Sequence, residues 1–257
     1  MAFKGIGIYI LECGKSYDMH GRNIESLELP GAVKDFQKVI KLGFMGKKTQ
    51  LFGLSSSPDL HVDPFFFNSD APSFFSTFEE FLSVTSFLSY RVFYFMGHSF
   101  TSEGHIYLKL PQSSERFPQI SCIPLNWLID EFSSASTRSL IIIDGCRKLL
   151  DRPASPLSGP INCHPSVDII TACSEGQYSY EFSYGEVNGG IFSHFFMESI
   201  LSFKNGESPF SLKDFFYQTK IDLEKCIENN YKGVVQTPQL ISQNMECNLL
   251  FDFLKSE

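Results

Sequence analysis

Continuous apolar runs alternate along this chain with segments in which apolar residues recur at three- and four-residue intervals. The continuous runs predict buried strands at residues 5–11, 51–54, 92–96, 140–143 and 167–173, with a last strand at 248–254. The helical spacing predicts amphipathic helices at residues 31–43, 77–88, 125–132, 191–203 and 212–227. A short hairpin arm is expected at residues 106–110. Because strands and helices alternate from end to end, we expect an α/β fold.

Two stretches lack any periodic pattern and are predicted to be exposed loops. Residues 55–72 are rich in Ser, Pro and Asp, and residues 150–165 contain four prolines. Neither stretch is long enough to divide the chain, and no internal repeat is present. We therefore expect one domain over residues 1–257, a length that buries a substantial core without metals or disulfides.

The composition excludes several classes of protein. The formal net charge is −8, whereas a nucleic-acid-binding face is basic, so we expect no nucleic-acid partner. No uncharged apolar run approaches the roughly 18 residues that a membrane-spanning helix needs, so we expect no membrane span. The seven cysteines form no C-x-x-C pair and no regular framework. This spacing favours a reducing compartment, and hence a cytoplasmic location.

Two of the predicted strands end in the same way, on a glycine followed by a chemically active side chain. The strand at 92–96 leads into His98, and the strand at 140–143 leads into Cys146. The carboxyl ends of parallel strands meet at one edge of an open sheet, where ligands bind. The separation of 48 positions (146 − 98) leaves room for a crossover helix, so we expect both side chains at the same edge.

A cysteine and a histidine at one sheet edge can act as a nucleophilic dyad. A thiol is largely protonated near neutral pH, so Cys146 needs a base, and His98 can accept its proton and return it to a leaving amine. The developing oxyanion needs aimed donors, for which the backbone N–H groups of Cys146 and Ser99 are candidates. The structural alternative is a buried, inert thiol beside a locally satisfied histidine.

Two other chemistries fit the same residues less well. Cys146 and Arg152 have the C-x5-R spacing of a phosphate-binding loop, but the residues between them include no glycine and one acid. Cys163 and His164 are adjacent, yet the six histidines show no metal-ligand spacing. We therefore expect neither a metal nor another cofactor.

Several motifs together resemble one family. F-Y-F-M-G-H at 93–98 and I-I-I-D-G-C-R-K at 141–148 look like the paired segments of the caspase-like cysteine proteases, in particular the paracaspase and metacaspase branch. Further similar segments follow the family's order: L-P-G-A-V-K-D at 29–35, I-I-T-A-C-S-E-G-Q-Y-S-Y-E at 169–181, N-G-G-I-F at 188–192 and Q-T-P-Q-L at 236–240. D-G-C-R-K is nearer the paracaspase motif, because metacaspases have a second cysteine where Gly145 stands.

The resemblance implies a caspase-like three-layer sandwich, with a six-stranded, mostly parallel sheet flanked by helices. It implies a thiol endopeptidase with a His98–Cys146 dyad, acting on proteins or peptides. It also implies that Asp35, Asp144 and Glu181 form an acidic S1 pocket selecting Arg, or Lys, before the cleaved bond. Caspases that cleave after aspartate need a basic pocket, so Asp144 argues against that specificity. Each acid also has a structural alternative. Asp35 could be a solvated helix residue, Asp144 a loop cap and Glu181 a surface charge.

Some features remain open at this point. The family's glycine after the histidine is Ser99 here, which is compatible with a weak enzyme or with an inactive scaffold that binds partners. No segment matches the aspartate cluster that binds calcium in many metacaspases, so the sequence does not support calcium activation. Relatives are monomers or pair through the last strand, and residues 248–254 fit either state. The loop at 150–165 is a hypothetical self-processing site, since Arg147 and Lys148 lie nearby; Arg152 is a poor candidate because Pro153 follows it.

Overall fold

The computed structural model describes residues 3–14, 29, 31–32, 34–35, 49–55, 71–102, 104–113, 121–133, 137–149, 161, 163–184, 187–204 and 211–243. The predicted strand at 248–254 lies outside these residues, as do most of the two predicted loops. Of the predicted helix at 31–43, only residues 31–32 and 34–35 are described, and they are helical.

A six-stranded sheet forms the centre of the molecule. Its strand order is β12-β9-β7-β3-β1-β2. All neighbouring strands are parallel except β12, which is antiparallel to β9. The strands are β1 (Phe3–Cys13), β2 (Thr49–Ser55), β3 (Leu88–Gly97), β7 (Arg138–Asp144), β9 (Val167–Thr171) and β12 (Gln239–Ile241). The predicted six-stranded, mostly parallel sheet is confirmed.

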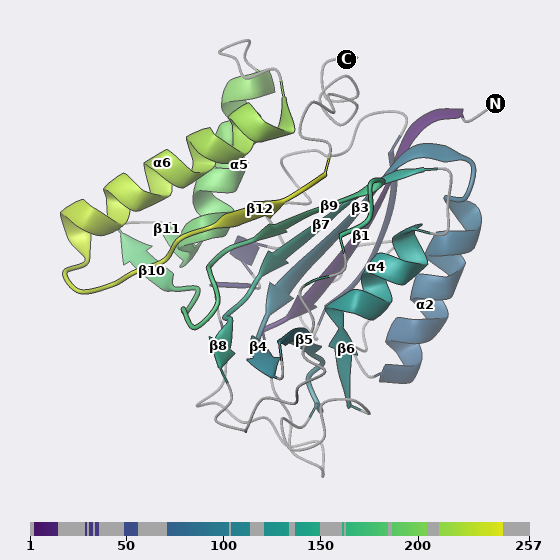
Figure 1. Ribbon diagram of the computed structural model, residues 1–257, viewed down its shortest axis with the longest axis horizontal. Helices are drawn as coiled ribbons and strands as arrows, with labels where there is room; N and C mark the ends of the chain where they lie inside the picture. Colours follow the sequence, from purple (N-terminus) through teal and green to yellow (C-terminus); the bar gives the residue numbers. More distant parts are fainter. Residues whose placement is uncertain are drawn as a thin grey trace.

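Helices cover both faces of this sheet (Figure 1). On one face lie α2 (Ala71–Val84) and α4 (Leu125–Ser133), and on the other lie α5 (Ile191–Lys204) and α6 (Leu212–Asn230). Side chains alternate between the faces because successive strand residues point in opposite directions. Ile141 and Ile143 accordingly join the core beneath α2 and α4, while Leu140 and Ile142 join the core beneath α5 and α6. Continuous apolar runs were therefore the correct signal for strands buried on both faces.

Smaller β-elements extend the carboxyl ends of the parallel strands. A four-stranded sheet has the order β6-β5-β4-β8, and β10 pairs with β11 in an antiparallel hairpin. The strands are β4 (Ser99–Ser102), β5 (His105–Lys109), β6 (Cys122–Pro124), β8 (Lys148–Leu149), β10 (Glu181–Tyr184) and β11 (Val187–Gly190). Of these, only β5 corresponds to an element expected from the sequence, the hairpin arm.

The helix predicted at 77–88 begins and ends earlier than expected. It starts at Ala71 because Phe74, with Phe78 and Phe81, continues the buried stripe toward the N-terminus. It ends before Thr85, whose hydroxyl accepts a hydrogen bond of 3.0 Å from Arg91 Nε. The chain then turns directly into β3. Within the described residues, no helix is both long and apolar enough to cross a membrane.

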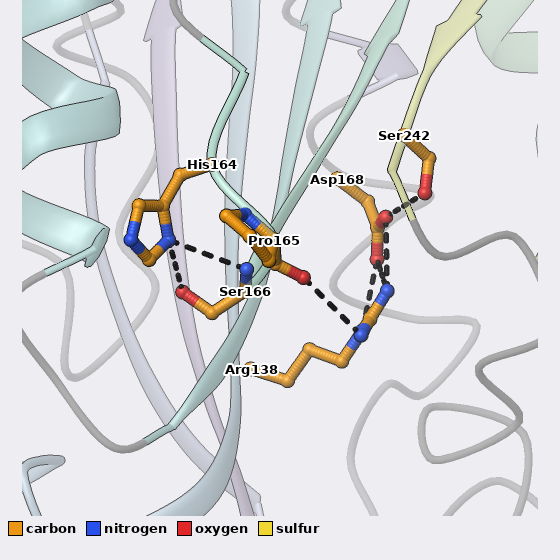
Figure 2. Close-up of polar contacts among 6 residues, drawn as sticks. All are labelled: Arg138, His164, Pro165, Ser166, Asp168 and Ser242. Carbon is orange, nitrogen blue, oxygen red and sulfur yellow. Dashed lines mark hydrogen bonds and ion pairs between the residues drawn. The ribbon is translucent and has the colours of Figure 1, made fainter.

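Side chains tie the antiparallel edge strand β12 to the sheet at the amino ends of β7 and β9. Arg138 forms an ion pair of 2.9 Å with Asp168, and Ser242, just after β12, also donates to the Asp168 carboxylate (Figure 2). The Asp168 side chain is 1% exposed. The segment that contains β12 is therefore held at this end by a closed polar cluster.

Candidate active site

The strand register brings His98 and Cys146 opposite each other. In the β3–β7 ladder Met96 pairs with Asp144, and in the β4–β8 ladder Phe100 pairs with Lys148. Both pairs differ by 48 positions (144 − 96 and 148 − 100), as do His98 and Cys146 (146 − 98). Since the two ladders keep one register, the histidine and the cysteine stand across from each other in the gap between them.

A cavity of about 80 Å³ opens beside these two residues. Its described lining includes His98 and Cys146 together with all three predicted acids, Asp35, Asp144 and Glu181. The five side chains come from five segments of the chain: the end of β3, the end of β7, the residues after it, the helical residues at 34–35, and β10. The lining contains no Lys or Arg among the residues that the structure describes.

Cys146 is partly exposed, and its Sγ lies 3.7 Å from the backbone oxygen of Ser179. Burial raises the pKa of the Cys146 thiol above its ordinary value. A backbone hydrogen bond with Ser179 acts in the opposite direction, and the charges of Asp144 and Glu181 raise the pKa further. The resting cysteine is therefore a protonated thiol near neutral pH, and nucleophilic attack requires a base that removes its proton.

Ser99 occupies an extended position in β4 and is buried. Its hydroxyl donates a hydrogen bond of 2.6 Å to the backbone oxygen of Cys146. A Cβ atom at Gly145 would collide with this same hydroxyl and would lie 2.7 Å from the Gly97 carbonyl oxygen. Glycine at 145 and serine at 99 thus fit each other, and the Ser99 side chain bridges the two strand ends.

The carboxylates of Asp35 and Asp144 converge at the start of α5. Asp144 accepts hydrogen bonds from Ser179 Oγ, at 2.7 Å, and from Ser193 Oγ, whereas Asp35 accepts one from Gly190 N at 2.6 Å. The N-terminus of a helix favours negative charge. Asp35 is only 2% exposed, which is not the environment of a solvated helix residue. Asp144 accepts a hydrogen bond from Ser193 in the first turn of α5 and also lines the cavity, so its carboxylate has both a capping and a lining position.

Glu181 reaches the same cavity from β10. Its Oε1 accepts a hydrogen bond of 3.1 Å from Ala32 N, although the residue as a whole is exposed. Burial raises the pKa of Glu181, as it does that of Asp144. Hydrogen bonds from the backbone of Gly31 and Ala32 lower the Glu181 pKa, and the surface residue Lys34 lowers it too.

Three glycines make room for these acids. A Cβ atom at Gly31 would lie 2.6 Å from Glu181 Oε1, and one at Gly190 would lie 2.7 Å from Asp144 Oδ2. A Cβ atom at Gly189 would overlap the Asp35 carboxylate. Contacts below 3.0 Å are not tolerated without movement. The Gly-Gly pair before α5 is therefore required by the carboxylates that pack over it.

Sequence reasoning missed the polar residues that hold the acids. Ser193 lies between Asp144 and Tyr94, whose hydroxyl is 2.7 Å from Ser193 Oγ. Ser179 and Gln236 form a second set of contacts around Asp144. Ser179 stands inside the Y-S-Y-E motif and Gln236 opens the Q-T-P-Q-L motif, so the motifs were visible while the roles of these two residues were not.

The alternative chemistries gain no support from the described residues. Within them no group of three or more His, Cys, Asp and Glu side chains is arranged to hold a metal ion. His164 Nδ1 lies 2.8 Å from Ser166 Oγ, near Arg138 and Asp168 (Figure 2), and His164 is not among the residues that line the cavity. Arg152, the second residue of the C-x5-R spacing, lies outside the described residues.

No protein-family model and no curated protein matches the sequence. Solved structures do. The initiator caspase Dronc of Drosophila superposes with a TM-score of 0.62 and 12% identity, over 97% of this chain and 85% of that chain. Caspase-1 of Spodoptera frugiperda superposes with a TM-score of 0.61 and 14% identity, over 94% of this chain and 88% of that chain.

The chain has a caspase-like fold. This confirms the predicted fold class: a central, mostly parallel sheet of six strands between two layers of helices. At 12–14% identity the likeness concerns the fold. The assignment to the paracaspase and metacaspase branch stays a prediction that rests on the sequence motifs.

Proposed function

We propose that this protein is a cysteine endopeptidase that cleaves peptide bonds after Arg or Lys. The observation that carries the proposal is the combination in one cavity of a Cys–His pair with three carboxylates and, among the described lining residues, no Lys or Arg. A thiol supplies the nucleophile, and an anionic cavity of this kind suits a guanidinium or ammonium side chain of the substrate.

The proposed reaction begins with proton transfer from Cys146 Sγ to the His98 imidazole. The thiolate attacks the carbonyl carbon of the scissile bond, and the backbone N–H groups of Cys146 and Ser99 stabilise the resulting oxyanion. The C–N bond then breaks, His98 returns the proton to the leaving amine, and a thioester remains on Cys146. Water, deprotonated by His98, hydrolyses the thioester and restores the thiol. The chemistry needs no metal or cofactor.

The carboxylates would provide the selectivity for the P1 residue. A guanidinium presents a planar fork of N–H donors that matches carboxylates. Placed beside Asp35, Asp144 and Glu181, it would stabilise the charged form of the acids, which burial otherwise disfavours at Asp144 and Glu181. An acidic P1 residue would be repelled by the same groups. Substrate binding should therefore lower the pKa of Asp144 and Glu181 toward the ordinary values.

A non-catalytic scaffold that binds partners is the second candidate function. Two observations favour it: the pKa of Cys146 is raised, and Ser99 stands where a glycine is expected. The Ser99 hydroxyl, however, is directed to the Cys146 carbonyl oxygen and not to the Cys146 sulfur.

A peptidase assay separates the two candidates. Arg-, Lys- and Asp-terminated fluorogenic peptides are offered to the wild type, to Cys146→Ala and to Cys163→Ala, which removes an exposed thiol outside the cavity. We expect turnover of the Arg peptide that falls about 10³-fold or more in Cys146→Ala and is unchanged in Cys163→Ala. Tight binding of an Arg peptide aldehyde without turnover would select the scaffold instead.

A further inference from the structure

Gln236 is a buried polar residue that reaches the active site from outside it. It follows α6 and precedes β12, and only 2% of it is exposed. Its side chain lies among groups of the cavity wall rather than in the cavity itself, and it takes no part in the proposed reaction. Its hydrogen-bond partners nevertheless belong to the residues that follow β9 and flank the nucleophile, at positions 172, 179 and 180.

The orientation of the Gln236 amide is determined by its neighbours. The backbone N–H of Tyr180 can only donate, so the atom 3.0 Å from it is the amide oxygen. The amide nitrogen then faces the Ala172 carbonyl oxygen at 3.1 Å and Ser179 Oγ at 3.3 Å. Both N–H groups of the amide are thus used as donors.

This orientation sets the direction of the hydrogen bond at Ser179. A serine hydroxyl carries one proton, and the oxygen of the Ser179 hydroxyl accepts an N–H from Gln236. The hydroxyl proton therefore points to Asp144 Oδ1, which lies 2.7 Å away. The result is a directed chain of donors from the Gln236 amide through the Ser179 hydroxyl to the Asp144 carboxylate.

We propose that Gln236 is a positioning residue, which acts through Ser179 to hold Asp144 charged and oriented for a cationic P1 side chain. The proposal rests on the proposed function for the identity of the ligand. The hydrogen bond from Ser179 is one of the interactions that lower the pKa of Asp144 against the larger effect of burial. Reversing its direction would weaken the binding of a guanidinium.

Gln236→Glu provides the reversal with almost no change in shape. In its ionised form the introduced carboxylate keeps the acceptor for Tyr180 N but has no proton to donate, so the Ser179 hydroxyl would turn toward it and away from Asp144. Ser179→Ala removes the intermediate hydroxyl and keeps the backbone oxygen near Cys146. The matched control is Gln243→Glu, since Gln243 donates its amide to Cys163 O, at 3.1 Å, outside the cavity lining.

The probe is agmatine, a free alkyl guanidinium, whose binding is measured by calorimetry as a function of pH and does not require turnover. In Gln236→Glu we expect about tenfold weaker agmatine binding, with the acidic limb of the pH profile moved to higher pH, and no change in Gln243→Glu. Ser179→Ala should give the same shift, and the double variant should be no worse than either single variant, because both changes break one chain.

Four results would overturn or redirect the proposal. A wild-type pH profile in Gln236→Glu, or additive losses in the double variant, would show that Gln236 does not act through Ser179. Agmatine binding by a wild type that cleaves no peptide would refute the peptidase activity alone and leave the role of Gln236 to be decided by calorimetry. If Gln236→Glu does not fold, Ser179→Ala with an unshifted profile would be sufficient to reject the chain.

Discussion

The two ends of the parallel strands hold buried carboxylates in opposite ways. At the amino end, Asp168 receives N–H groups from Nε and Nη2 of the Arg138 guanidinium, so the carboxylate is paired with a positive charge (Figure 2). At the carboxyl end, the described hydrogen bonds to Asp35 and Asp144 come from backbone N–H groups and serine hydroxyls. These neutral donors orient the carboxylates without cancelling their charge.

These two ways of holding a carboxylate have different consequences for folding and for ligand binding. A buried ion pair satisfies itself, and removal of one partner leaves a charge stranded in a poor solvent. Burial raises the pKa of Asp168 as well as that of Asp144, but the Arg138 cation and Ser242 act against this rise at Asp168, whereas Ser193 and Ser179 do so at Asp144. The described contacts of Asp168 therefore include a cation, whereas the hydrogen bonds described for Asp144 come from serine hydroxyls, an arrangement that suits the cationic ligand proposed above.

Among substitutions that leave the Cys146–His98 pair intact, Asp144→Asn should have the largest effect on activity. The amide keeps the size of the side chain but loses the charge, so we expect kcat/KM for an Arg peptide to fall about 10²- to 10³-fold, equivalent to about 3–4 kcal/mol. A citrulline peptide, which has nearly the shape of arginine without its charge, should be affected far less. Equal losses for both peptides would argue against an ionic S1 site. Asp130→Asn, at an exposed position of α4, is the control.

Asp168→Asn should lower stability and leave activity nearly unchanged. Loss of one partner of the Arg138 ion pair is expected to lower the free energy of unfolding by about 3 kcal/mol, measured by urea denaturation. The kcat/KM for the Arg peptide should remain within about twofold of the wild type, since the pair lies at the other end of the strands. A marked loss of activity at unchanged stability would show that the two ends are coupled.

A change of pH should produce the smallest effect. Burial raises the pKa of Asp144 and Glu181 above the ordinary values of 3.8 and 4.5, so these acids take up protons earlier than free carboxyls as the pH falls. KM for the Arg peptide should then rise several-fold on acidification, at a pH above the ordinary carboxyl range, while KM for the citrulline peptide stays level.

Acidification should weaken substrate binding, but it should increase the contribution of these acids to folding stability. The folded, unliganded protein binds these protons more tightly than the unfolded chain, so the contribution of the two acids to the free energy of unfolding increases as the pH falls through the raised pKa values. Asp144→Asn should flatten that part of the stability profile, which thermal denaturation at a series of pH values would measure.

Much of the fold could be predicted, because its strands are buried on both faces. Runs such as residues 140–143 have no polar alternation to obscure them, and the helices between them keep a clear apolar stripe. The small sheet of β4, β5, β6 and β8 was largely missed. Its strands are two to five residues long, and they exist because β3 and β7 continue in register beyond the central sheet.

The sequence alone therefore determined the alternation of strands and helices and the two strand ends that carry His98 and Cys146. It also carried the motifs in which the acids occur. Only the tertiary structure decided that Asp35, Asp144 and Glu181 share one cavity, since segments more than 30 residues apart meet there through strand pairing and packing. The same holds for Ser179, Ser193 and Gln236, because a hydrogen bond between distant residues depends on distances and directions that no local pattern encodes.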